Sequence, residues 1–181
     1  MMDEIPEQPV PAVSVLRTPS DGGTSPRAAA LAPILEHNPI LDAYLLNYLA
    51  NFYVGPLLKV VDARQGLTRP EWIVIFCLTQ NEGLNAQQIS DATGRAKSSV
   101  SHAVKLLQKK KLLRRMPDPL DGRRQVLRLT VTGRAAYKDL VAFFIEREDA
   151  MLACLTTAER RMLRKLMLKL TDNMDSWAKS Y

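Results

Sequence analysis

The chain has 181 residues, 46% of them hydrophobic and 24% charged, which is enough apolar material for one core and excludes wholesale disorder. No uncharged apolar run approaches the roughly 18 residues that a membrane span needs, and the acidic start MMDEIPEQ lacks the basic character of a secretory signal, so we expect a cytoplasmic protein. The net charge of +6 is concentrated in residues 83–134, where twelve basic and three acidic side chains leave a net +9. Such a block is typical of a protein that binds a polyanion, although a solvated basic surface would explain it equally well.

The N-terminal stretch differs in composition from the rest. Residues 1–35 contain six of the eleven prolines, and this predicts a flexible tail that precedes a domain over residues 36–181. From Pro39 to Phe52, apolar residues recur at three- and four-residue steps, and the stripe resumes after Gly55-Pro56, where we expect a kink. The pattern predicts a long first helix over residues 40–62.

Start and stop signals define the next helices. The spacing from Thr68 to Glu71 is that of a capping box, and it predicts the start of a second helix. Asn85 repeats that spacing with Gln88, and Gly94 supplies a left-handed stop, which predicts a short third helix. A fourth helix follows the tight turn and runs from about 97 to 110. A short helix, a tight turn and a longer helix with a small, basic outer face are typical of a helix-turn-helix.

The fourth helix carries the predicted DNA contacts. Its apolar stripe predicts a buried side, and its opposite side presents donors small enough to enter a major groove about 12 Å wide. His102 is equally consistent with a DNA contact and with a solvated surface residue. The run 109–111 is equally consistent with phosphate contacts and with a solvated helix end. The candidate DNA-binding residues of this helix are Lys97, Ser98, Ser99, Ser101, His102 and Lys105.

A β-hairpin is predicted directly after this helix. Residues 113–116 and 125–129 are typical of two short strands, and the Pro, Asp and Gly residues between them are strong turn signals. Arg123 and Arg124 would then lie near the tip of a wing, where arginine can enter a narrow minor groove. Asp121 is expected to orient Arg123. The helix-turn-helix and wing together predict a DNA-binding lobe over residues 66–134.

The terminal helices predict a homodimer. Thr130 opens a fifth helix, and the spacing from Thr156 to Glu159 caps a sixth, whose apolar stripe extends to Trp177. Segments 36–65 and 135–181 carry more apolar surface than one small lobe can cover, so we expect them to pack against a second copy. The predicted fold class is therefore mainly α with a small β-wing: a winged helix-turn-helix with long N- and C-terminal dimerisation helices.

The chain resembles the MarR family of winged-helix regulators. The resemblance rests on AKSSVSHAVKLLQKKKLLRR followed by DPLDGRRQVLRLTVTG, in which Asp121, Arg123 and Gly133 have the family's wing spacing. It implies a dimeric transcriptional repressor that binds double-stranded DNA at a palindromic site. It also implies a pocket for a small aromatic ligand between the dimer helices and the winged lobe. Two positions depart from the family: Lys111 replaces the usual Gly, and Ala96 replaces the usual Ser cap. The aromatic walls expected for that pocket are Tyr48, Phe52 and Trp72.

Other functional classes have weaker support. No nucleophile–base pair, phosphate loop or metal-ligand cluster is recognisable, so we expect no enzyme activity, no metal and no cofactor. Cys77 lies in an apolar run, and both Cys77 and Cys154 are interpreted as structural rather than as redox sensors. The alternative to a DNA-binding regulator is a winged-helix module that binds RNA or a protein partner.

Overall fold

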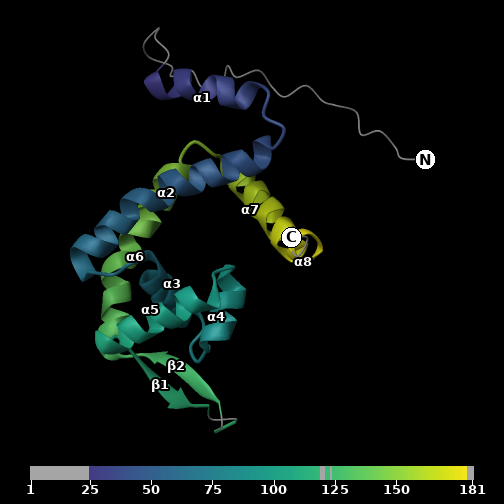
Figure 1. Ribbon diagram of the computed structural model, residues 1–181. Helices are drawn as coiled ribbons and strands as arrows, with labels where there is room; N and C mark the ends of the chain where they lie inside the picture. The colour runs from purple at the N-terminus through teal and green to yellow at the C-terminus, as the bar shows by residue number, and fades with distance from the viewer. Residues whose placement is uncertain (1–24, 119–120, 123, 179–181) are drawn as a thin grey trace. The chain divides into compact units, whose positions relative to one another are not determined.

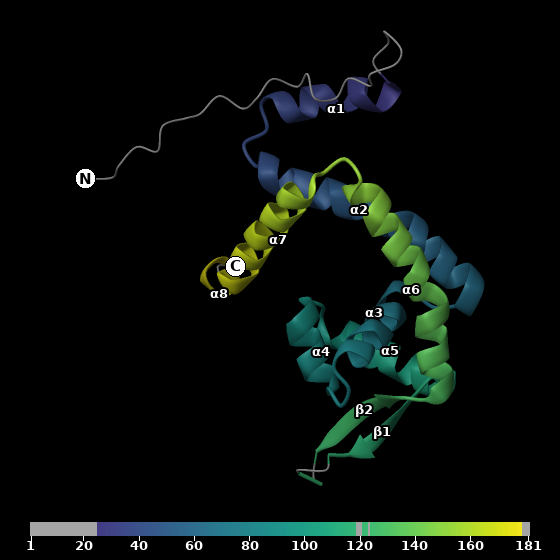
Figure 2. The same ribbon diagram turned by 180° about the vertical axis from the view of Figure 1, so that it is seen from behind.

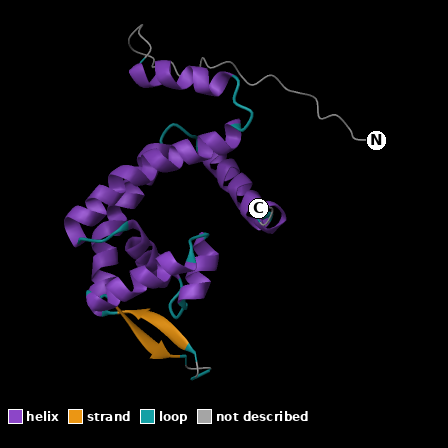
Figure 3. Cartoon of the chain, viewed as in Figure 1, coloured by secondary structure: helices purple, strands orange, loops and turns teal. Residues whose placement is uncertain are grey.

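The computed structural model describes residues 25–118, 121–122 and 124–178, which are mostly helical with one antiparallel hairpin (Figure 3). The predicted fold class, mainly α with a small β-wing, is confirmed. The chain divides into two compact units, Met1–Asn51 and Phe52–Tyr181, whose boundary falls inside the second helix. The elements in chain order are α1 (Pro26–Glu36), α2 (Leu41–Gln65), α3 (Arg69–Gln80), α4 (Ala86–Thr93), α5 (Lys97–Lys109), β1 (Leu113–Pro117), β2 (Gln125–Leu129), α6 (Val131–Leu152), α7 (Thr157–Asp172) and α8 (Met174–Trp177).

Helix α1 lies within the stretch whose composition predicts a tail. The Ser25 hydroxyl accepts a hydrogen bond from the Ala28 N–H at 3.1 Å, and Pro26 occupies the first turn, where its missing N–H costs nothing. Ala28 and Leu31 are buried. A Ser-Pro start signal is local, so the proline-rich average of the surrounding sequence conceals it. The other residues of the predicted tail, 1–24, lie outside the described part of the chain.

Helix α2 remains helical through Pro56 because another helix replaces the bond that proline removes. Proline has no N–H, so the Phe52 carbonyl loses its usual partner four residues later. The Arg147 guanidinium of α6 donates to that carbonyl and, at 2.8 Å, to the carbonyl of Tyr53. In return, the Tyr53 hydroxyl donates to the Phe144 carbonyl at 3.2 Å. These bonds join α2 and α6 inside the unit that begins at Phe52.

The caps read from the sequence define the ends of α3, α4 and α6. Asn85 and Gln88 bond each other's backbone N–H groups at 3.0 and 2.9 Å, so α4 begins where the capping box predicts. Gly94 ends α4 with a φ of 63°. The Thr130 hydroxyl accepts from the Gly133 N–H at 3.1 Å and starts α6. All these bonds span at most four residues, which is why local spacing predicts them.

The core of the larger unit lies where α3, α5 and α6 meet the hairpin. Figures 1 and 2 show α3, α4 and α5 grouped beside β1 and β2, with α6 leaving from the base of the hairpin. Side chains from α3 and α5 interdigitate there, and Leu140 of α6 closes the group. The fully buried side chains include Val74, Ile75, Leu78, Ile89, Val100, Val104, Leu107 and Leu140.

The hairpin pairs β1 with β2 in an antiparallel register that sets Leu113 opposite Leu129 and Arg115 opposite Leu127. A third segment joins this ladder at its base. The Gly83 N–H donates to the Leu127 carbonyl at 3.2 Å, and the Leu127 N–H donates to the Leu84 carbonyl at 3.0 Å. The turn between α3 and α4 therefore anchors the wing to the lobe.

The C-terminal helices differ from the prediction in one respect. The sixth predicted helix was expected to carry its stripe through Trp177, but α7 ends at Asp172 and the short α8 follows Asn173. None of the residues of α7 is buried within the chain. Its large apolar side chains are instead exposed: Met162, Leu166, Met167, Leu168 and Leu170.

Candidate nucleic-acid interface

Helix α5 has one buried face and one exposed face. Val100, Ala103, Val104 and Leu107 are buried in the core. The predicted DNA contacts line the other side, because the 3.6-residue period separates them from that stripe. Lys97, Ser98, His102 and Lys105 are exposed, while Ser99 and Ser101 are partly buried at the margins.

The start of α5 is open to an anion. Ala96 precedes it and offers no side-chain cap, and no acidic residue lies in its first turn. The backbone N–H groups of a first turn have no partners within the helix and carry the positive end of its dipole. With Ala in place of Ser at this position, backbone N–H groups remain available to donate hydrogen bonds to a DNA phosphate.

At the wing, the structure describes Arg124 but not Arg123. The Arg124 side chain is 75% exposed, and its Nε lies 3.1 Å from Oδ2 of Asp121. The Arg124 N–H also donates to the Asp121 carbonyl at 2.8 Å. Arg123, and with it the predicted Asp121–Arg123 pair, lies outside the described residues. Within them, Asp121 orients Arg124.

Sequence reasoning missed three further cations near this face. Arg114 and Arg115 are both exposed on β1, and neither forms an ion pair with the described residues. Arg95 lies in the turn before α5, where burial and then the charge of Arg69 lower its pKa. All of them except Arg69 belong to the +9 block. The net charge of +9 over residues 83–134 was the sequence signal that could have identified Arg95, Arg114 and Arg115 as candidate DNA contacts.

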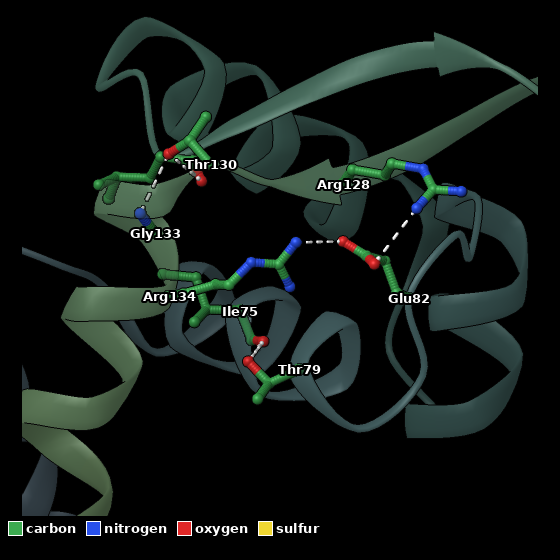
Figure 4. A network of polar contacts seen from close by, with 8 residues as sticks. Ile75, Thr79, Glu82, Arg128, Thr130, Gly133 and Arg134 are labelled. Carbon is green, nitrogen blue, oxygen red and sulfur yellow. Dashed lines mark hydrogen bonds and ion pairs between the residues drawn. The ribbon is translucent and has the colours of Figure 1, made fainter.

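A carboxylate at the base of the wing ties three elements together. Glu82, in the turn after α3, lies 3.2 Å from Arg128 of β2 and 2.7 Å from Arg134 of α6 (Figure 4). Its two oxygens are divided between the two guanidinium groups. Together with the backbone bonds to Leu127, this arrangement fixes the strand that carries the wing relative to α3 and α6.

The basic run at the end of α5 separates into different environments. Lys109 and Lys111 are exposed, whereas Nζ of Lys110 lies 2.6 Å from the buried carboxylate of Glu71. Lys110 is exposed as well, with 36% of its side chain accessible, but its ammonium group is engaged by Glu71 and is not a free phosphate donor. The alternatives set out for the run apply only to its other two members.

The aromatic residues expected to line a ligand pocket lie in different surroundings. Trp72 is only 5% exposed and is stacked on Phe144 at 4.6 Å and on Tyr137 at 5.8 Å, so its faces are occupied by the core. Phe52 is about half exposed. Tyr48 belongs to the unit that ends at Asn51, where its ring stacks on Tyr44.

A shallow cavity of about 280 Å³ lies between α2 and α6. Its wall is mostly apolar, with Arg147 and Glu146 as its charged members. None of the three aromatic residues expected at a ligand pocket lines it. The lining residues are Pro56, Leu57, Val60, Phe143, Glu146, Arg147 and Ala150.

The cysteines show no sign of a reactive site. Burial raises the pKa of the Cys77 thiol, which packs against the core, and a raised pKa makes a thiol less reactive. Cys154 is exposed after α6. Within residues 25–118, 121–122 and 124–178, no three His, Cys, Asp or Glu side chains are grouped to hold a metal ion. In the same part of the chain, no helix is long and apolar enough to cross a membrane.

Comparisons with known proteins agree with this geometry. A family model described as MarR family matches residues 65–124. An uncharacterised HTH-type transcriptional regulator of Bacillus subtilis, YwaE, is 29% identical over 91 residues, which span half of this chain and 53% of that protein. Thus the match covers only about half the length of this relative.

Two solved structures are similar over most of their length. The PcaV transcriptional regulator of Streptomyces coelicolor is 25% identical, with a TM-score of 0.59 over 76% of this chain and 94% of that one. A MarR/EmrR family transcriptional regulator of Acinetobacter sp. ADP1 is 30% identical, with a TM-score of 0.67 over 75% of this chain and 95% of that one. With its helix-turn-helix, its wing and this extended match, the chain belongs to the MarR family of transcriptional regulators.

Proposed function

We propose that the protein is a sequence-specific repressor that binds double-stranded DNA as a homodimer on a palindromic operator and responds to a small ligand. The observation that carries DNA binding is the outer face of α5, where Lys97, Ser98 and His102 are exposed at a helix start without a side-chain cap. Small and cationic donors at the start of a helix suit base edges and phosphates in a major groove. The exposed Arg124 extends this basic surface along the wing.

Selection of binding sites from a random DNA library tests the proposal directly. We expect the purified protein to enrich a two-fold symmetric sequence whose half-site centres lie about one helical turn, ~10 bp, apart. Enrichment of no sequence, or a footprint on one half-site only, would contradict it. Structured RNA added as competitor separates the alternative function, because an RNA-binding winged helix would be displaced from DNA at low RNA concentration.

The homodimer is supported by the surface of α7. That helix buries none of its residues within the chain, and Met162, Leu166 and Leu170, which lie four residues apart on one face, are each more than half exposed. A contiguous apolar face of this kind is uncommon on a monomeric protein. A second copy supplies an identical apolar face, and two-fold symmetry lets each cover the other.

The ligand response is supported by the Streptomyces relative, whose structure is described as a complex with its natural ligand. In this chain we place the proposed ligand in the cavity between α2 and α6, rather than against Trp72. A panel of phenolic and aromatic acids should include a compound that raises the melting temperature and weakens operator binding. Val60→Trp, which fills the cavity, should abolish that response, whereas a response unchanged in this variant would exclude the cavity. Val60 lies among the lining residues.

A further inference from the structure

An ion pair between exposed Lys110 and buried Glu71 joins the end of α5 to the start of α3. Glu71 is 0% exposed, and its Oε2 accepts from both the N–H and the hydroxyl of Thr68 at 2.8 Å. Its Oε1 lies 2.6 Å from Nζ of Lys110, which also donates to the Gly66 carbonyl at 2.7 Å. Lys110 is the residue that ends α5. One ammonium group thus contacts both the first turn of α3 and the end of α2.

Glu71 stays charged although it is buried, and its partner Lys110 remains 36% exposed. Burial acts to raise the pKa of Glu71, but hydrogen bonds from Lys110 and Thr68 outweigh it and lower the pKa overall. A buried ion pair adds little net stability, because removing both charges from water costs about as much as their attraction returns. Removing one partner is different, because the other charge is then left buried and unpaired. The pair therefore enforces one geometry more than it stabilises the fold.

The ion pair constrains the orientation of α5, the helix that carries the proposed base contacts. The rest of α5 is held by apolar side chains such as Val100 and Leu107, and apolar contacts are non-directional. At the opposite end, Ala96 provides no side-chain bond. The Lys110 contact is thus a directional constraint between α5 and α3, and we expect the position of Ser98 and His102 in a groove to depend on it.

We infer that Glu71 and Lys110 are positioning residues for sequence-specific DNA recognition: their ion pair, whose carboxylate is buried, fixes α5 against α3 so that its outer face meets the base edges in one register. The inference rests on the proposed DNA-binding function. It separates the three lysines at the end of α5 into two roles. Lys109 and Lys111 contribute charge at the surface, and Lys110 contributes orientation.

The test compares Lys110→Met with Lys109→Met. Both variants remove one positive charge from the same helix end, but only Lys110→Met leaves the buried Glu71 carboxylate without its cationic partner. Affinity is measured by fluorescence anisotropy for the sequence selected by the wild-type protein and for a scrambled duplex. Lys109→Met should lower both affinities by the same factor, so that their ratio does not change. Lys110→Met should lower the ratio of specific to non-specific affinity by about tenfold or more, equivalent to losing one base-edge contact.

The dependence on pH and a double variant distinguish positioning from a general loss of stability. Without Lys110, only Thr68 opposes the effect of burial, so the pKa of Glu71 should rise; lowering the pH from about 8 to 6 should then restore part of the stability of Lys110→Met but not its ratio, because no ammonium group orients α5. Glu71→Gln/Lys110→Met removes the pair without leaving an unpaired charge, so it should regain stability at both pH values but keep the lowered ratio, and it also serves if the single variant does not fold. His102 is the histidine on α5, and any protonation of it is common to all variants and cancels against Lys109→Met.

Each outcome decides the inference. A lowered ratio that persists in the double variant supports it, whereas a ratio that the double variant restores overturns it, because the unpaired charge alone would then explain the loss. An equal ratio in Lys110→Met and Lys109→Met overturns it and leaves the proposed function intact. If the wild-type protein selects no sequence, the proposed function fails and the inference fails with it.

Discussion

Gly133 stands in the first turn of α6, directly against the backbone that follows α5. A Cβ at this position would lie 2.1 Å from the Leu112 carbonyl oxygen and 3.3 Å from Cδ2 of Leu129. The same carbonyl accepts from the Thr130 N–H at 3.0 Å, so it cannot move without breaking the start of α6. The glycine of the wing motif is therefore required by a close approach between two backbones.

Gly133→Ala should lower the free energy of unfolding by about 1–3 kcal/mol, the usual cost of overpacking a close contact. Urea denaturation measures it. Gly55→Ala is the matched control, because a Cβ there meets nothing within 4 Å and the residue lies inside α2. That control should gain up to about 1 kcal/mol from helix propensity. Equal effects of the two substitutions would show that the contact with Leu112 relaxes freely.

Lys111 keeps the geometry of the glycine that it replaces. Its φ is 59°, and its N–H donates to the Gln108 carbonyl while the Leu112 N–H donates to the Leu107 carbonyl, both at 2.9 Å. This is the bond pattern of a Schellman helix end, for which glycine is preferred. The departure from the family therefore leaves the turn intact and introduces backbone strain.

Lys111→Gly should stabilise the fold by up to about 1 kcal/mol, because glycine adopts a left-handed φ without a steric penalty. Thermal unfolding with a matched Lys109→Gly variant provides the measurement. Lys109 lies in α5, so its replacement should destabilise by about 1 kcal/mol. A loss of stability in both variants would mean that the Lys111 side chain itself makes a stabilising contact.

At the scale of elements, we expect the wing and α5 to have separate roles in the proposed DNA binding. Phosphate and groove contacts mainly set affinity, whereas base-edge contacts discriminate between sequences. Arg123→Ala should cost about 1–3 kcal/mol of binding and flatten the log–log salt slope by roughly one unit per chain. Binding titrations at several salt concentrations measure both quantities. Lys59→Ala, at an exposed position of α2, serves as the control for loss of one charge. An unchanged slope in Arg123→Ala would remove the wing from the DNA interface.

The contact between the end of α2 and the middle of α6 depends on an ionised carboxylate. Asp139 accepts from Nη2 of Arg64 at 2.6 Å and from the Gln65 amide at 2.8 Å. These bonds, that of Arg64 first, lower the pKa of Asp139 from 3.8 to about 2. A depressed pKa in the folded state means that the contribution to stability is complete above pH 3.8 and is lost as the pH falls through about 2.

The difference in unfolding free energy between wild type and Asp139→Asn should therefore be constant above pH 3.8 and should narrow as the pH approaches 2. Urea titrations at stepped pH values measure it. Asp62→Asn, at an exposed position of the same helix as Arg64, controls for loss of one negative charge. A difference that widens in acid would contradict the assignment of an ionised Asp139.

At the scale of the whole molecule, the exposed apolar face of α7 is the surface that we propose to pair with a second copy. Leu166→Glu should convert the proposed dimer to a monomer at micromolar concentration, because a carboxylate would be buried without a counter-charge. Sedimentation velocity measures the change. The neighbouring Lys165→Glu reverses a charge on the same exposed helix and should leave the dimer intact. A wild-type protein that sediments as a folded monomer would refute the homodimer.

Much of the local architecture could be predicted from the sequence. The starts of α3, α4, α6 and α7 follow from Thr68, Asn85, Thr130 and Thr156, and the end of α4 follows from Gly94. These signals work because each joins groups at most four residues apart, so chain spacing alone brings them together. The exposed face of α5 follows from helical periodicity in the same way.

Only the tertiary structure decided how residues far apart in the chain are used. It paired Lys110 with Glu71, divided Glu82 between Arg128 and Arg134, and placed Trp72 between Tyr137 and Phe144. Sequence patterns assigned these side chains only to classes, such as a basic run or an aromatic wall. The choice among partners depends on which groups the packed core shields from water. A shielded charge needs an opposite charge or hydrogen bonds beside it, and a shielded ring needs apolar or aromatic neighbours.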